Sequence, residues 1–165
     1  MERDARKLRK LPLVFLAGLL LLCLGLYGFL YYFGSPLLPG SLERRYAGQV
    51  EAHQEELFQV AQAALQTGKA PEELPLPGTV KQVELWNYSV TAPEAGAVAF
   101  FCQGWGLTPS ASYYGFYYAP KGPVAFQGVD VPLRPQGHGY TWEQEDNRGY
   151  TCPLGGGFYY YEAHF

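Results

Sequence analysis

The sequence predicts an α+β fold: an N-terminal transmembrane helix, then one amphipathic helix packed on an antiparallel β-sheet. Residues 11–33 contain no Asp, Glu, Lys or Arg, and residues 41–67 carry apolar side chains at helical spacing. Residues 80–165 are rich in aromatic strand formers, which Gly and Pro turns interrupt. The predicted parts are a basic tail (1–10), a transmembrane signal-anchor helix (11–33), a linker (34–40) and one α+β domain (41–165).

The apolar run at 11–33 is long enough to cross a membrane as a helix. At ~1.5 Å per residue it spans about 35 Å, against a hydrocarbon core of roughly 30 Å. It ends in three aromatic residues, which are typical of a membrane interface rather than of a signal-peptidase cleavage site. A cleaved secretory signal stays open because residues 34–35 are small, whereas Cys23 lacks the small preceding residue of a lipoprotein signal. We expect an uncleaved anchor with the lipid bilayer as its partner.

The charges around this run predict its orientation. Five basic residues lie within the first ten, and the next basic residue after the run is Arg44. Basic flanks stay on the cytoplasmic side, so we expect a cytoplasmic tail at 1–10 and a domain outside the cell membrane. Residues 34–165 carry seven Lys and Arg against thirteen Asp and Glu, which argues against nucleic acid as a partner.

After the linker, residues 41–67 predict a single amphipathic helix. Leu42, Tyr46, Val50 and Leu57 share one face. Gly68 is a natural C-terminal stop.

The remaining chain predicts an antiparallel sheet over about 80–165. We expect strand pairs 80–90 with 97–103, 112–119 with 124–127, and 140–145 with 150–152, followed by a last strand at 158–165. The helix at 41–67 is expected to cover one face of this sheet and to leave the other open.

Tyrosine is unusually dense in the expected sheet. Because successive strand residues point to opposite faces, both faces carry aromatic rings. Aromatic surface on an open face favours a binding role, so Tyr114, Tyr118 and Tyr160 are candidate partner-binding residues. The alternative is cross-strand aromatic packing that only stiffens the sheet.

Two cysteines follow the predicted span, Cys102 and Cys152. Outside the cytoplasm they could form a disulfide. The alternative is two buried free thiols, because Cys behaves as a small apolar residue.

The sequence predicts no catalytic residue, no metal ligand and no cofactor, since the common nucleophile, phosphate-binding and zinc motifs are missing. The weak catalytic candidates are Glu162 with His164 on one strand face, or either of Cys102 and Cys152 with a histidine. An acidic turn at 143–147 does not have the spacing of a calcium loop.

The overall arrangement resembles small membrane-anchored bacterial proteins with a Tyr/Gly-rich C-terminal domain. The resemblance rests on the basic tail, the anchor, and the stretches YYGFYY, DNRGYT and GGGFYYYEAHF. It implies an anchor followed by one domain and implies no activity, since this group has none known.

The leading hypothesis is therefore a single-span membrane protein whose domain outside the membrane binds an envelope protein or a cell-wall glycan without catalysis. The alternatives are a membrane-tethered hydrolase and a structural accessory subunit of a membrane complex. The sequence leaves the oligomeric state open.

Overall fold

The computed structural model describes the backbone of residues 2–71, 77–107 and 110–165, with side chains from Phe15 onward in these ranges. As predicted, the fold is α+β, and the described residues form three α-helices and a seven-stranded antiparallel sheet. The chain divides into two compact units, residues 1–42 and 43–165, and each is described by itself.

The helices and strands follow one another in a simple order. The helices are α1 (Glu2–Phe33), α2 (Ser41–Ala52) and α3 (Gln54–Thr67), with the short 3-10 helices η1 (Pro93–Ala95) and η2 (Phe126–Gly128). The strands are β1 (Gln82–Trp86), β2 (Ala97–Leu107), β3 (Ser110–Tyr118), β4 (Arg134–Gln136), β5 (Gly139–Gln144), β6 (Asn147–Gly155) and β7 (Phe158–His164). Neighbouring strands follow the order β1-β2-β3-β7-β6-β5-β4.

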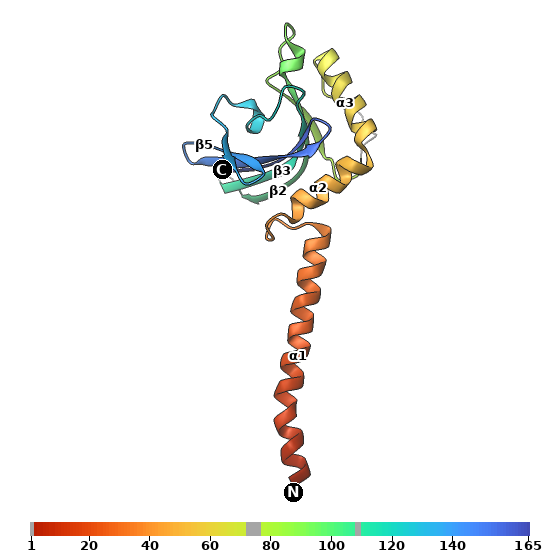
Figure 1. Cartoon of the computed structure of the whole chain (residues 1–165), viewed down its shortest axis with the longest axis vertical. Helices are drawn as coiled ribbons and strands as arrows, with labels where there is room; N and C mark the ends of the chain where they lie inside the picture. The colour runs from red at the N-terminus through yellow and green to blue at the C-terminus, as the bar shows by residue number, and fades with distance from the viewer. Residues whose placement is uncertain (1, 72–76, 108–109) are drawn as a thin grey trace. The chain divides into compact units, whose positions relative to one another are not determined.

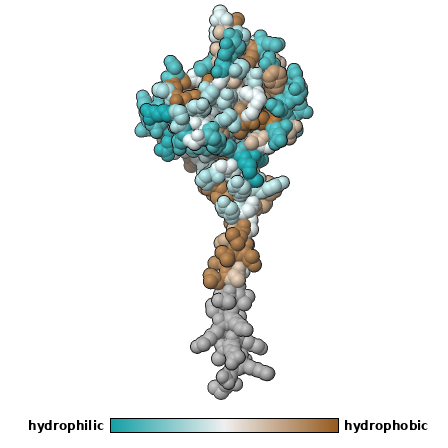
Figure 2. Space-filling view, viewed as in Figure 1, coloured by the Kyte–Doolittle hydropathy of each residue, from teal (hydrophilic) through white to brown (hydrophobic). Residues whose placement is uncertain are grey.

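The first unit consists mainly of α1. Among the described residues, one helical stretch, Phe15–Phe33, is long and apolar enough to cross a membrane. Its large apolar side chains are exposed, and Figure 2 shows them as a continuous brown surface. The helix begins at Glu2, so the backbone of the predicted basic tail is helical from residue 2. It ends at Phe33 as expected, where Gly34 takes a left-handed conformation with φ of 77°.

The predicted single helix over 41–67 is two helices, α2 and α3. His53 breaks it with φ of −126° and ψ of 23°, which are not helical values. A sheet twists, so two shorter helices can follow its face where one straight helix of this length could not. Helix α3 ends as predicted at Gly68, whose left-handed backbone lets its N–H donate to the carbonyl of Ala64 at 2.9 Å.

Both helices pack on one face of the sheet, called here the helix face. Figure 1 shows α2 and α3 running along one side of the strands. Tyr46 of α2 lies 6.1 Å, between ring centroids, from both Phe116 and Tyr160. Phe58 of α3 meets Tyr118 edge to face at 5.5 Å. The expected cover of one face by this helical segment is therefore present.

Two of the three predicted strand pairs are confirmed, β1 with β2 and β5 with β6. The pair of 112–119 with 124–127 is wrong, because β3 pairs instead with β2 and β7. Pro120 and Pro123 flank the turn and have no N–H to donate to a ladder, so the chain leaves the sheet there. Residues 124–127 run into η2, and the short strand β4 had no pattern strong enough to predict it.

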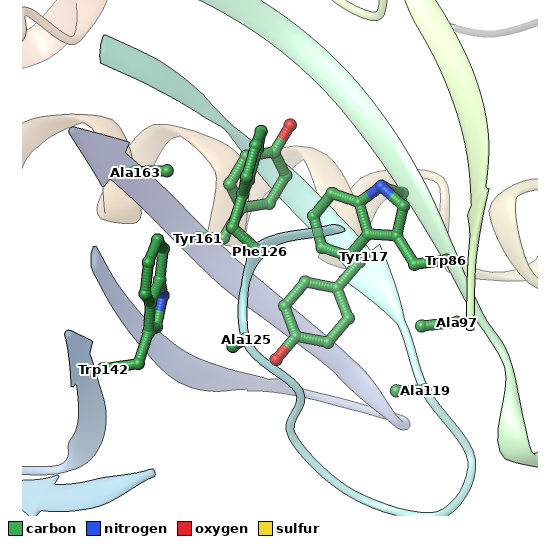
Figure 3. Close-up of a cluster of buried hydrophobic side chains, with 10 residues drawn as sticks. Trp86, Ala97, Tyr117, Ala119, Ala125, Phe126, Trp142, Tyr161 and Ala163 are labelled. Carbon is green, nitrogen blue, oxygen red and sulfur yellow. The ribbon is translucent and has the colours of Figure 1, made fainter. Parts of the chain in front are cut away.

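The second face of the sheet is also covered, contrary to the expectation of an open face. Residues 119–133, between β3 and β4, fold over it and are called here the covering segment. Ala125 and Phe126 of this segment join a buried cluster with Trp86, Tyr117 and Tyr161 of the sheet. Figure 3 shows these rings side by side, with the helices behind the strands. The sheet therefore has an apolar layer on each face.

Candidate functional site

The three predicted partner-binding tyrosines do not form a surface. Tyr114, Tyr118 and Tyr160 are only 5, 6 and 3% exposed. All three lie on the helix face, where Tyr118 meets Phe58 and Tyr160 meets Tyr46. Burial raises the pKa of Tyr114 and Tyr160 above the ordinary tyrosine range. The interpretation of these residues as an exposed face is wrong, because the helices cover them.

A different group of aromatic rings lies at one end of the opposite face, where Phe101, Tyr113 and Phe165 are partly exposed and Phe126 and Tyr161 are buried behind them. They line a cleft of about 830 Å³, called here the aromatic cleft. Its rings are Phe101, Tyr113, Phe126, Tyr161 and Phe165. They contact one another: Tyr113 is stacked on Phe126 with 5.8 Å between centroids, and Phe165 meets both edge to face at 5.6 and 5.5 Å. The cleft thus has a continuous aromatic wall.

The sheet and the covering segment position these rings together. Phe101, Tyr113 and Tyr161 come from β2, β3 and β7, and Phe126 comes from η2 of the covering segment. Glu84 of β1 and Asn147 of β6 line the same cleft although three strands lie between theirs. The sheet must therefore curl over this face, as strongly twisted sheets do.

Polar side chains surround the aromatic wall. Gln82, Glu84, Gln127, Asp146 and Asn147 supply amide and carboxylate groups. The indole N–H of Trp86 donates to Glu84 Oε2 at 3.2 Å, which fixes one carboxylate at the rim. Among the described lining residues none is Lys or Arg, so the fixed charge at the rim is negative. Such a site disfavours phosphate and other anions and suits a neutral or cationic ligand.

Glu162 and His164 are neighbours on the helix face, as the alternation of β7 predicts. His164 Nε2 lies 3.7 Å from Glu162 Oε1, and its Nδ1 lies 2.8 Å from Ser112 Oγ. Both residues border a shallow pocket of about 520 Å³, but Ser112 is not among its described lining residues. In the hydrolase hypothesis the hydroxyl that His164 contacts, that of Ser112, therefore does not line the pocket that the acid–base pair borders.

The two cysteines of the domain are free and buried. Cys102 lies in β2 and Cys152 in β6, with β3 and β7 between them. Three interstrand steps put them about 14 Å apart along the sheet, whereas a disulfide requires Cα atoms within about 7 Å. Of the two alternatives that the sequence left open, the structure has the two buried free thiols and not the disulfide. Burial also raises the pKa of each thiol to about 12, so neither is a thiolate nucleophile at neutral pH.

The residues of the aromatic cleft were not singled out from the sequence. Tyr113 and Phe165 lie in the aromatic stretches quoted above but were not chosen as binding residues, and Phe126 and Gln127 fell in a segment predicted as a strand. Gln127 holds a positive φ of 54°, which ends any strand at this point. The only usable signal was the aromatic excess itself.

Comparisons with protein-family models, with curated proteins and with solved structures find no match to this chain. The resemblance to small membrane-anchored bacterial proteins stays a prediction. The function must be argued from the geometry alone.

Proposed function

We propose that this chain is a single-span membrane-anchored protein whose domain, outside the membrane, binds a cell-wall glycan in the aromatic cleft without catalysis. The observation that carries the proposal is the cleft itself: five contacting rings beneath a rim of amides and carboxylates.

The anchor is supported by the surface of α1. Side chains such as Leu16, Leu21 and Leu22 are more than half exposed. An apolar helix surface of this size is unfavourable in water and favourable in a hydrocarbon core. The basic residues before it favour a cytoplasmic N-terminus, which supports an outer location for residues 43–165.

The shape of the cleft favours a glycan over a protein partner. Its volume of about 830 Å³ is in the range of small-molecule sites, whereas a protein interface is broad and needs little concavity. The C–H faces of sugar rings can pack on the flat rings of Tyr113 and Phe165. Hydroxyl groups can donate to Glu84 and Asp146 and exchange hydrogen bonds with Gln127. An envelope protein is the competing ligand.

The test measures binding of N-acetylglucosamine oligomers to the purified full chain in detergent by titration calorimetry. Phe165 is suited to substitution because its side chain is 38% exposed. We expect Phe165→Ala to weaken binding roughly tenfold, the cost of one lost stacking contact. Trp105→Ala is the matched control, since Trp105 is an exposed aromatic residue of the same domain outside the cleft.

The outcomes separate the ligand from the site. Failure of the unmodified chain to bind any oligomer would reject the glycan and favour an envelope protein. Equal weakening by Trp105→Ala and Phe165→Ala would reject the cleft. A sulfated oligosaccharide should bind less well than a neutral one, because the charged side chains among the described rim residues are carboxylates.

A further inference from the structure

Three side chains of metal-binding types meet on the helix face, away from the aromatic cleft. They are Glu43 of α2, His138 between β4 and β5, and Cys152 of β6. One ligand atom from each, a carboxylate oxygen, an imidazole nitrogen and the thiol sulfur, lies within 4.8 Å of the other two. The closest approach is 2.9 Å, between His138 Nε2 and Glu43 Oε1.

The backbone around His138 is built to bring it to β6. Gly137 has a φ of +59°, a conformation that side chains other than Gly rarely adopt. On the other side, a Cβ at Gly139 would collide with the carbonyl of Thr151 and lie 2.7 Å from Cys152 Cβ. Glycine on both sides of His138 therefore permits a tight turn whose chain runs directly against Cys152.

We propose that Glu43, His138 and Cys152 bind a divalent transition-metal ion of the zinc class. Sulfur, imidazole nitrogen and carboxylate oxygen are the three donor types of protein zinc sites. A thiolate excludes hard ions such as Mg²⁺ and Ca²⁺, which take oxygen ligands. The thiol gives its proton to solvent on binding, so one thiolate and one carboxylate balance the two positive charges of the ion.

Access and surroundings fit this assignment. The side chain of His138 is 65% exposed and that of Glu43 27%, so an ion can enter from solvent, while Cys152 is buried at the base. The hydroxyl of Tyr150 lies 3.4 Å from His138 Nε2. It also forms a side-chain hydrogen bond with Cys152, so it stands where a hydroxyl can orient the sulfur ligand. Three protein ligands leave a fourth position for water.

This inference is independent of the glycan proposal, because the cluster and the aromatic cleft share no residue. The simpler alternative is a surface His138–Glu43 ion pair above a buried thiol. The metal site and the ion pair differ in one measurable respect. Only in a metal site do the sulfur of Cys152 and the nitrogen of His138 bind the same ion.

The test adds Co²⁺ to the reduced full chain in detergent and records the thiolate-to-cobalt charge-transfer absorption. We expect this band with one ion per chain and its displacement by Zn²⁺. His138→Gln should remove it, and this variant should fold because the side chain is largely exposed. His53→Gln and His164→Gln are the matched controls, since they change the other two histidines and should keep the band.

The cysteines give the second half of the test. Cys152→Ala should lose the band and Cys102→Ala should keep it. In parallel, Zn²⁺ at about a hundredfold excess over its dissociation constant should raise the midpoint of thermal unfolding by roughly 10 °C. That rise should be absent in His138→Gln. No band in the unmodified chain, or a band that survives in His138→Gln, would overturn the proposal and leave the ion pair as the explanation.

Discussion

The hydroxyl groups of Tyr117 and Thr151 lie 2.8 Å apart in the buried interior, although β7 separates their strands. The Thr151 hydroxyl also lies 2.7 Å from the carbonyl oxygen of Tyr160, and the Tyr117 hydroxyl lies 3.1 Å from that of Val124, so each has a second acceptor and either can be the donor in the pair. The Tyr117 hydroxyl also accepts the N–H of Val124 at 3.0 Å. One side chain therefore connects β3, β6 and the covering segment.

Replacing Tyr117 with Phe should lower the free energy of unfolding by about 1–3 kcal/mol, because the partly buried Val124 N–H and the buried Thr151 hydroxyl each lose a partner. The measurement is urea unfolding of the full chain in detergent, followed by tryptophan fluorescence. Thr151→Val and the double variant complete a mutant cycle. Simple addition of the two losses would show that the pair is not coupled.

The same substitution should also affect the aromatic cleft. Val124 is two residues before Phe126, which lines the cleft together with Gln127. Loosening the covering segment at Val124 should weaken ligand binding more than a substitution on the helix face does, even one that costs more stability. Tyr118→Ser provides that comparison.

Tyr118→Ser should act on stability rather than on recognition. Tyr118 is buried against Phe58 and Phe158, so truncation leaves a cavity and should cost about 3–5 kcal/mol. Thermal unfolding followed by circular dichroism measures this cost. Phe165→Ala, at the rim of the cleft, should change the midpoint little and still weaken binding. The reverse pattern would restore Tyr118 as a binding residue.

The sequence was sufficient for the local elements and insufficient for their layers. Helix ends at Phe33 and Gly68 were readable because glycine carries the left-handed conformation that ends a helix. Strand alternation correctly predicted that Glu162 and His164 lie on the same face. Side chains two residues apart in a strand share a face whatever the rest of the fold is. Whether the second face of the sheet is covered depends on where residues 119–133 pack. The local sequence of that segment does not indicate this position.

The candidate sites could not be predicted from the sequence for the same reason. Glu43, His138 and Cys152 are far apart in the chain, so no spacing motif could join them. A disulfide between Cys102 and Cys152 stayed open at the level of the sequence. The strand order, which puts β2 and β6 apart, cannot be derived from the sequence pattern. Burial of Tyr114, Tyr118 and Tyr160 likewise follows from the side on which α2 and α3 pack.

The buried thiol of Cys102 makes stability fall at alkaline pH. Its pKa is raised to about 12 when folded, against 9.0 for an unperturbed thiol, because burial disfavours the thiolate. A raised folded pKa contributes stability that is complete below about pH 9 and is lost as pH rises toward 12. By pH 10 the loss should be about 1 kcal/mol.

Urea unfolding at pH 8 and pH 10 measures this dependence, and Cys102→Ala should show a smaller decline than the unmodified chain. Other buried groups titrate in both proteins, so the difference between the two isolates Cys102. A chain held by a Cys102–Cys152 disulfide would show no such difference and would lose stability on reduction.

The orientation of the chain is tested with a single added thiol at Lys121. Its side chain is 66% exposed, in the turn after β3, and its only described partner is Glu94 at 4.0 Å. A Lys121→Cys chain in intact cells should react with a membrane-impermeant maleimide, because the basic flank predicts residues 43–165 outside. The unmodified chain is the control, and it should label weakly since Cys102 and Cys152 are buried. Labelling that appears only after lysis would place the domain in the cytoplasm and exclude a cell-wall glycan as its ligand.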